Sequence, residues 1–137
     1  MAVIVTGGCL CGAVRYELTT SPVFSEHCYC RDCQRVTGAA MGSLLFVPKG
    51  DFRITKGELK QFATKAASGN EVVRGFCGTC GSWVTGRGSG SPELVEVTAG
   101  SLDNPNLFKA MANIFMSSAP SWAPIAEGLP KFDKMPN

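Results

Sequence analysis

Apolar residues along this chain occur in short runs or alternate with polar residues. Val95 and Val97 alternate with Glu96 and Thr98, which is the period of two expected of a half-buried strand. Similar patterns predict strands at Val3–Thr6, Ala13–Leu18, Phe24–Cys28, Ser43–Val47, Phe52–Thr55, Leu59–Ala63, Glu71–Phe76, Trp83–Thr85 and Leu94–Thr98. The pattern therefore indicates a fold built mainly from short strands.

Glycine and proline mark the turns between these strands. The 16 glycines and eight prolines are spaced as expected of β-meanders joined by tight turns. The turn segments are Gly7-Gly8, Pro48–Asp51, Lys56-Gly57 and Ser68–Asn70. The longer stretch Gly86–Pro92 is glycine-rich, and we expect its first part, Gly86–Ser91, to be a mobile surface loop.

Segments that favour a helix are few. One short helical turn is predicted at Arg31–Val36 and a second at Asn106–Ala112, after Asn104-Pro105. A chain of 137 residues is long enough for one domain and marginal for two. We therefore predict a single, mostly-β domain over residues 1–137.

Composition supports a buried core. Apolar residues make up 45% of the chain and charged residues 18%, which excludes wholesale disorder. The aromatic residues expected to fill the core between meanders are Phe46, Phe52, Phe62, Phe76 and Trp83.

Charge and hydropathy exclude several classes of partner. The formal charge is +2, and seven thiolates with two zinc ions would bring it to about −1. Basic residues are scattered, so nucleic acid is not an expected partner. The N-terminus has no basic leader, and no apolar run approaches the roughly 18 residues of a membrane span. A cytoplasmic protein is expected.

Seven cysteines lie in three tight clusters, and they are the strongest chemical signal of the chain. The clusters are Cys9-x-Cys11, Cys28-x-Cys30-x-x-Cys33 and Cys77-x-x-Cys80. Two residues between thiols let one turn direct both sulfur atoms at a single point. In a reducing compartment such clusters bind metal more often than they form disulfides.

The seven cysteines divide naturally into four and three. Cys9 and Cys11 would point to one face of a strand, and Cys77 and Cys80 bracket a glycine-rich turn. Together these four would close a structural zinc site. The alternatives are a redox pair at Cys77 and Cys80, or two buried free cysteines at Cys9 and Cys11. The redox pair is disfavoured because such motifs usually open a helix.

Cys28, Cys30 and Cys33 would hold a second zinc ion with one open position. His27 precedes Cys28 and would point to the opposite face of the strand, either as a neighbour of the ligands or as a packing residue. Water or an incoming thiol would complete the shell. Three thiolates reduce the Lewis acidity of the ion, which favours thiol activation over hydrolysis. An iron–sulfur cluster is the chemical rival.

With these residues in place, the chain resembles the glutathione-dependent formaldehyde-activating enzyme family, which includes centromere protein V. The similar stretches are Gly8–Tyr16, His27–Arg35, Phe76–Ser82, Val97–Asp103 and Trp122–Phe132. They follow the family order and cover nearly the whole chain.

The resemblance implies an all-β fold of coiled meanders organised around cysteine-ligated zinc. It implies two Zn²⁺ ions per chain, one structural on Cys9, Cys11, Cys77 and Cys80, the other catalytic on Cys28, Cys30 and Cys33. It also implies a carbon–sulfur lyase that condenses glutathione with formaldehyde to S-hydroxymethylglutathione. Another thiol or aldehyde, and a homo-oligomeric state, fit the same resemblance.

Two positions depart from the family pattern near the end of the chain. Asn113 stands where many members have a histidine before an Ile-Phe pair, and Ala119 where a lysine often follows the nearby serine. A peptide with two carboxylates needs fixed cations. The remaining candidates are Arg31, Arg35, Arg74 and Lys109.

A second hypothesis is a non-catalytic zinc module that binds a protein partner. A fourth protein ligand at the Cys28 cluster would favour that hypothesis, whereas an open position favours the enzyme.

Overall fold

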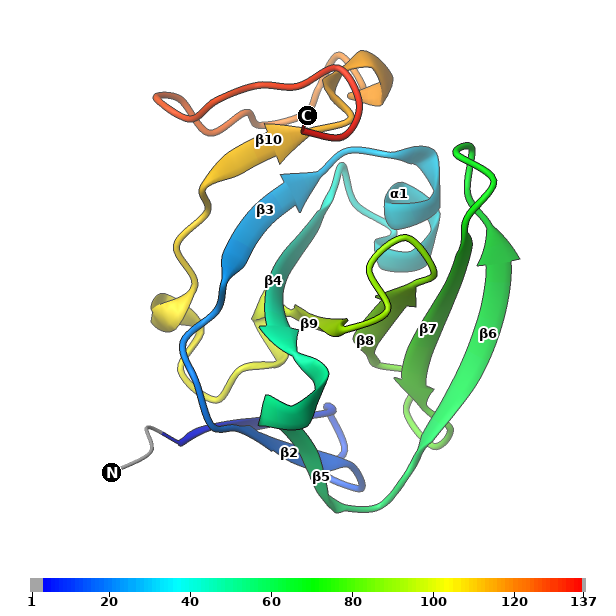
Figure 1. Ribbon diagram of the computed structural model, residues 1–137, viewed down its shortest axis with the longest axis vertical. Helices are drawn as coiled ribbons and strands as arrows, with labels where there is room; N and C mark the ends of the chain where they lie inside the picture. Colours follow the sequence, from blue (N-terminus) through cyan, green and yellow to red (C-terminus); the bar gives the residue numbers. More distant parts are fainter. Residues whose placement is uncertain (1–3, 137) are drawn as a thin grey trace.

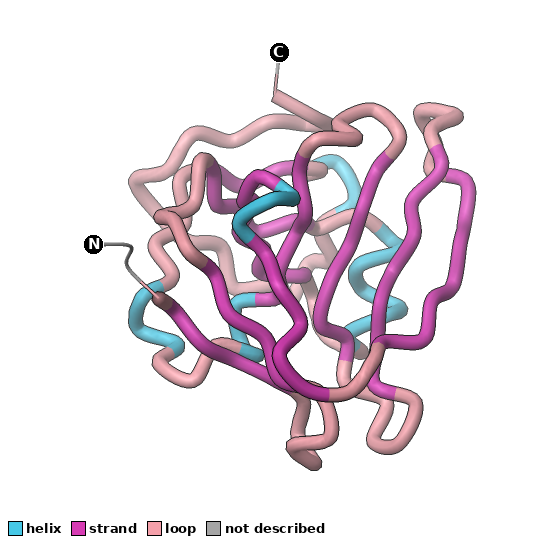
Figure 2. The backbone as a smooth tube through the Cα atoms, turned by 60° about the horizontal axis from the view of Figure 1, so that its bottom comes forward, coloured by secondary structure: helices cyan, strands magenta, loops and turns pink. Residues whose placement is uncertain are grey.

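The computed structural model describes residues 4–136, and it is mostly β-sheet with short helical segments (Figure 2). A three-stranded sheet has the order β1-β2-β5. Its strands are β1 (Val5–Gly8), β2 (Arg15–Leu18) and β5 (Phe52–Lys56). Both pairings in this sheet are antiparallel, as expected of meanders joined by short turns.

A seven-stranded sheet has the order β10-β3-β4-β9-β8-β7-β6. Its strands are β3 (Phe24–Cys28), β4 (Gly42–Pro48), β6 (Leu59–Lys65), β7 (Glu71–Cys77), β8 (Trp83–Gly88), β9 (Leu94–Thr98) and β10 (Ala112–Ile114). The small sheet lies across one end of the large one, and helix α1 (Arg31–Thr37) stands toward the other end (Figure 1). The all-β prediction is therefore confirmed.

The main core lies where β2, β4, β8 and β9 bring apolar side chains together. Val95 and Val97 have no exposed surface, so the alternation along the sequence identified the core face of β9 correctly. Tyr16 and Leu18, two residues apart on β2, bury against the same cluster. A second apolar cluster surrounds Cys28 and Cys33.

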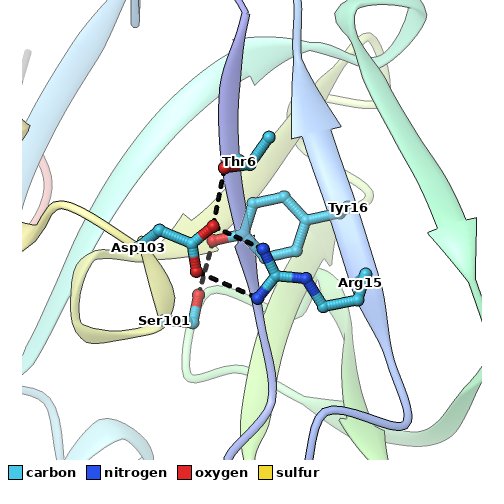
Figure 3. A network of polar contacts seen from close by, with 5 residues as sticks. All are labelled: Thr6, Arg15, Tyr16, Ser101 and Asp103. Carbon is cyan, nitrogen blue, oxygen red and sulfur yellow. Dashed lines mark hydrogen bonds and ion pairs between the residues drawn. The ribbon is translucent and has the colours of Figure 1, made fainter.

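A polar network fastens the small sheet to the segment after β9 (Figure 3). Asp103 accepts hydrogen bonds from the Thr6 hydroxyl at 2.6 Å and from Arg15 Nη1 at 2.9 Å. Ser101 donates to the Thr98 carbonyl, so its hydroxyl accepts from Tyr16, with the two oxygens 2.7 Å apart. The Arg15 guanidinium, followed by the Thr6 hydroxyl, lowers the pKa of Asp103 to about 2.

The short helical turn predicted at Asn106–Ala112 is confirmed only at its start. The structure has a single 3₁₀ turn, η3 (Pro105–Leu107), started by the Asn104 side chain accepting from the amide of Asn106. The end of the segment instead enters β10, which pairs in parallel with β3. Pairing with a strand distant in sequence outweighs local helix propensity here.

Other sequence expectations need smaller corrections. Gly86–Ser91 is not all loop, because β8 continues to Gly88, and the glycine pair at positions 7 and 8 lies within β1. Phe62 is 64% exposed on the edge strand β6 and does not fill the core. The predicted strand at Val3–Thr6 begins outside the described residues. Strand alternation places a residue on a face, but only the packing of sheets decides whether that face is covered.

The turn between β5 and β6 depends on a glycine with no space beside it. Gly57 has a φ of +72°, and a Cβ atom there would lie 2.1 Å from the carbonyl oxygen of Ala13. Gly69 has a φ of +89° but open space around it. We expect Gly57→Ala to lower the free energy of unfolding by about 3 kcal/mol, and Gly69→Ala by only about 1 kcal/mol. Urea denaturation of both variants measures this, and equal losses would contradict the packing argument.

Candidate functional site

The first cysteine cluster consists of two pairs that are distant in sequence and come together in one site. The sulfur atoms of Cys9, Cys11, Cys77 and Cys80 all lie within 4.8 Å of one another. The sulfurs of Cys9 and Cys11 are 3.7 Å apart, and those of Cys11 and Cys77 are 3.8 Å apart. Disulfide sulfurs would be about 2.05 Å apart. Four sulfurs bound to one tetrahedral zinc at about 2.3 Å would be about 3.8 Å apart, so the donor set fits a single ion.

Local amides and hydroxyls point at these sulfur atoms. The amide of Val14 donates to Cys9 Sγ at 3.2 Å, and the amide of Thr79 donates to Cys77 Sγ at 3.4 Å. The hydroxyl of Ser82 lies 3.2 Å from Cys80 Sγ. Such donors stabilise negative charge on sulfur, as the turn chemistry around Cys77 predicts.

The thiols of this cluster differ in pKa. Hydrogen bonds from the side chain and backbone of Ser82 lower the pKa of Cys80 to about 5. The amide of Ala13 lowers the pKa of Cys11, but burial and the neighbouring sulfurs outweigh it and raise that pKa to about 11. Thiolates this close repel one another, and a cation between them would relieve the repulsion.

The second cluster lies where β3 ends and α1 begins. The sulfur atoms of Cys28, Cys30 and Cys33 lie within 4.8 Å of one another. Cys28 and Cys33 are buried, and Cys30 is the N-cap of α1, with its sulfur accepting from the Cys33 amide at 3.3 Å. The neighbouring thiols hold the pKa of Cys30 well below its ordinary value and, with burial, raise that of Cys28. Within residues 4–136, no histidine, aspartate, glutamate or further cysteine joins this group of three.

A cavity of about 470 Å³ opens beside the second cluster, and all three of its cysteines contribute to the wall. The rest of the wall comes mainly from β4, β7 and β9 and from the β6–β7 and β8–β9 turns. Apolar lining residues include Leu44, Phe46, Val72, Leu94, Ile114 and Phe115. A three-sulfur group at the wall of a cavity can meet a small ligand, whereas the four-sulfur group is closed on itself.

His27 faces away from this cavity, as the alternation of β3 predicts. Its Nδ1 lies 2.9 Å from the Ser43 hydroxyl, and its ring meets Phe108 edge-on at 5.4 Å between centroids. Burial lowers its pKa. His27 is thus a packing residue on the opposite face of the strand, rather than a member of the cysteine cluster.

Of the four predicted cations, two line the cavity. Arg31 and Arg74 contribute to its wall, whereas Arg35 and Lys109 are exposed elsewhere. The guanidinium carbon of Arg74 lies 5.6 Å from the centroid of the Trp83 ring, and its Nη1 donates to the Thr64 hydroxyl at 3.3 Å. The Nε atom of Arg74 is buried without a hydrogen-bond partner. Arg74 therefore keeps an unused donor.

The two departures from the family pattern lie outside the cavity wall. The Asn113 side chain is fully buried and donates to the carbonyl of Ala126 at 2.9 Å, which ties β10 to the C-terminal tail. Its Oδ1 atom is buried without a partner. Ala119 is half-buried just beyond Ser118, which does line the cavity. Neither departure changes the charge of the wall.

Sequence reasoning missed four charged residues of the wall, of which Asp32 lies within the Cys28–Cys33 segment itself. Glu26 lies two residues before Cys28, so strand alternation could have placed it on the same face. Glu96 and Lys65 come from β9 and β6, and no local signal places them near the cysteines. Burial raises the pKa of Glu26 to about 8 and that of Glu96 to about 7.

Comparison with known proteins supports this description. A crystal structure of a Rhodobacter sphaeroides protein is similar at a TM-score of 0.59 and 25% sequence identity, over 77% of this chain and 96% of that chain. A search of curated proteins found no significant match. No helix among residues 4–136 has the length and apolar character needed to cross a membrane. The model of the glutathione-dependent formaldehyde-activating enzyme family matches residues 4–118, and the chain therefore belongs to that family.

Proposed function

We propose that the protein is a zinc-dependent carbon–sulfur lyase that joins glutathione or another thiol to formaldehyde or another aldehyde. The observation that carries this proposal is the group of three cysteines without a fourth protein ligand at the wall of a cavity. Family membership supports the same chemistry.

We assign the two clusters to different tasks. Cys9, Cys11, Cys77 and Cys80 would hold a structural zinc ion, which links β1 to the β7–β8 turn. Cys28, Cys30 and Cys33 would hold the catalytic zinc ion. Sulfur separations below 4.8 Å support single ions rather than an iron–sulfur cluster, since a cluster distributes its thiolates over several iron atoms.

The second ion would supply an open coordination position, at which a thiol would bind as its thiolate. In the overall reaction the sulfur forms a bond to the aldehyde carbon, and the carbon–oxygen double bond becomes single. The proton lost by the thiol ends on that oxygen, so a neutral hydroxymethyl thioether is formed. The reverse reaction is the carbon–sulfur cleavage from which the lyase class takes its name.

The protein's own residues would position the reactants. Apolar side chains such as Phe46, Ile114 and Phe115 narrow the cavity and limit the water that competes with the thiol. The positive charge of Arg74 lowers the pKa of both Cys30 and Cys33, although their neighbouring sulfurs have the larger effects. Arg74 would thus help to keep these ligands in the anionic form that zinc needs.

Two matched cysteine variants test the division of tasks. We expect the wild-type protein to contain about two zinc ions per chain by elemental analysis. Cys30→Ser should lose one ion and reduce activity by about two orders of magnitude while keeping the wild-type circular dichroism spectrum. Cys77→Ser should instead lower the unfolding temperature sharply, because a structural zinc contributes directly to folding. Loss of both ions and global unfolding in Cys30→Ser would contradict the assignment.

Thiol titration separates the enzyme from the non-catalytic binding module. We expect the zinc-loaded protein to bind glutathione in the millimolar range or tighter, and to consume formaldehyde when both are present. Calorimetry measures the binding and a formaldehyde assay the turnover, with Cys30→Ser as the control. Absence of both binding and turnover would leave the binding module as the better description.

A further inference from the structure

The floor of the cavity carries two carboxylates beside the three-cysteine cluster. Glu26 on β3 is 3% exposed, and Glu96 on β9 is half-buried. Both side chains line the cavity, and neither forms a hydrogen bond or salt bridge within the described part of the chain. Carboxylates removed from water in this way need a partner that donates hydrogen bonds or carries positive charge.

Strand register determines the neighbours of Glu96 in the sheet. Across the sheet, Phe46 on β4 and Gly86 on β8 flank Glu96, and Arg74 on β7 is the neighbour of Gly86. A Cβ atom at Gly86 would lie 2.3 Å from Oε2 of Glu96, so the carboxylate extends over the glycine. Its charge attracts Arg74, which partly offsets the effect of burial on the pKa of Glu96. Arg74 and Glu96 nevertheless do not form a salt bridge in the described residues.

The carboxylates and cations of the wall are equal in number, but the cations are the more exposed. Glu26, Glu96 and Asp32 are buried or half-buried, whereas Arg31 and Lys65 are exposed and only Arg74 is half-buried. Under the proposed function, three cysteinates with one Zn²⁺ add a net charge of about −1, and a bound substrate thiolate adds another. A ligand with further negative charge would be repelled, and one with a cation would be attracted.

We propose that Glu96, with Glu26 beside it, forms a subsite for an amino group, so that the thiol substrate is an amine-bearing thiol. The inference rests on the proposed function, since the zinc ion would hold the sulfur while Glu96 receives the ammonium group. The two carboxylates lie on the cavity side of β3 and β9 and share this wall with Cys28 and Cys30. They would therefore bind the amino end of a substrate whose sulfur is held by the zinc ion.

Binding of small thiols to the zinc-loaded protein tests the subsite directly. The probes are cysteamine and 3-aminopropanethiol, which differ in chain length, against 3-mercaptopropionate and neutral 2-mercaptoethanol. Formaldehyde is omitted because aminothiols cyclise with it. We expect calorimetry to show at least one amine binding about tenfold or more tighter than 3-mercaptopropionate.

Three variants test whether Glu96 causes the preference for amine-bearing thiols. Glu96→Gln should reduce the ratio of amine to carboxylate affinity about fivefold or more. Gly86→Ala should also reduce it, because the new methyl group displaces the carboxylate without removing its charge. Glu93→Gln, an exposed glutamate outside the cavity, is the matched control and should leave the ratio unchanged.

The outcomes separate the two proposals. If all thiols bind without preference, or if the preference survives in Glu96→Gln, the amino subsite is wrong while the thiol-binding enzyme stands. If no thiol binds to zinc-loaded wild-type protein, the proposed function fails, and the subsite fails with it.

Discussion

Mutual repulsion of closely spaced sulfur atoms is the constraint on which the site depends. Seven cysteines from three segments lie in two groups, and the sulfurs of each group are within 4.8 Å of one another. If several of them ionise without a cation, each thiolate raises the pKa of its neighbours, as at Cys28. The β-sheets bring the sulfurs together despite this cost, which is the arrangement expected when a metal ion offsets it.

Strand alternation divides the molecule into a core face and a cavity face. On β9, Val95 and Val97 enter the core, whereas Glu96 faces the cavity. On β3, Glu26 and Cys28 share the cavity side, and His27 packs against Ser43 and Phe108 on the other. The same sheet thus supplies apolar packing on one side and reactive groups on the other, because successive side chains point to opposite faces.

The cavity contains polar groups that are unfavourable for folding. Glu26 is 3% exposed and forms no hydrogen bond in the described residues, and the Nε atom of Arg74 is buried without a partner. Such groups are costly in a small domain whose stability is a small difference between large terms. Their position beside the open cysteine group is typical of a site arranged for a ligand.

The sequence by itself determined the all-β class, most strand positions and the division of the cysteines into four and three, because turn residues, alternation and ligand spacing are local signals. Only the tertiary structure decided which strands are neighbours. It ended the helical turn after Leu107 and placed Ala112 in a strand beside β3, and it left Phe62 exposed on an edge. It also brought Glu96 and Arg74 to the cavity, although they are distant in sequence from Cys28. Strand order in a sheet depends on long-range pairing and packing, which no short stretch of sequence encodes.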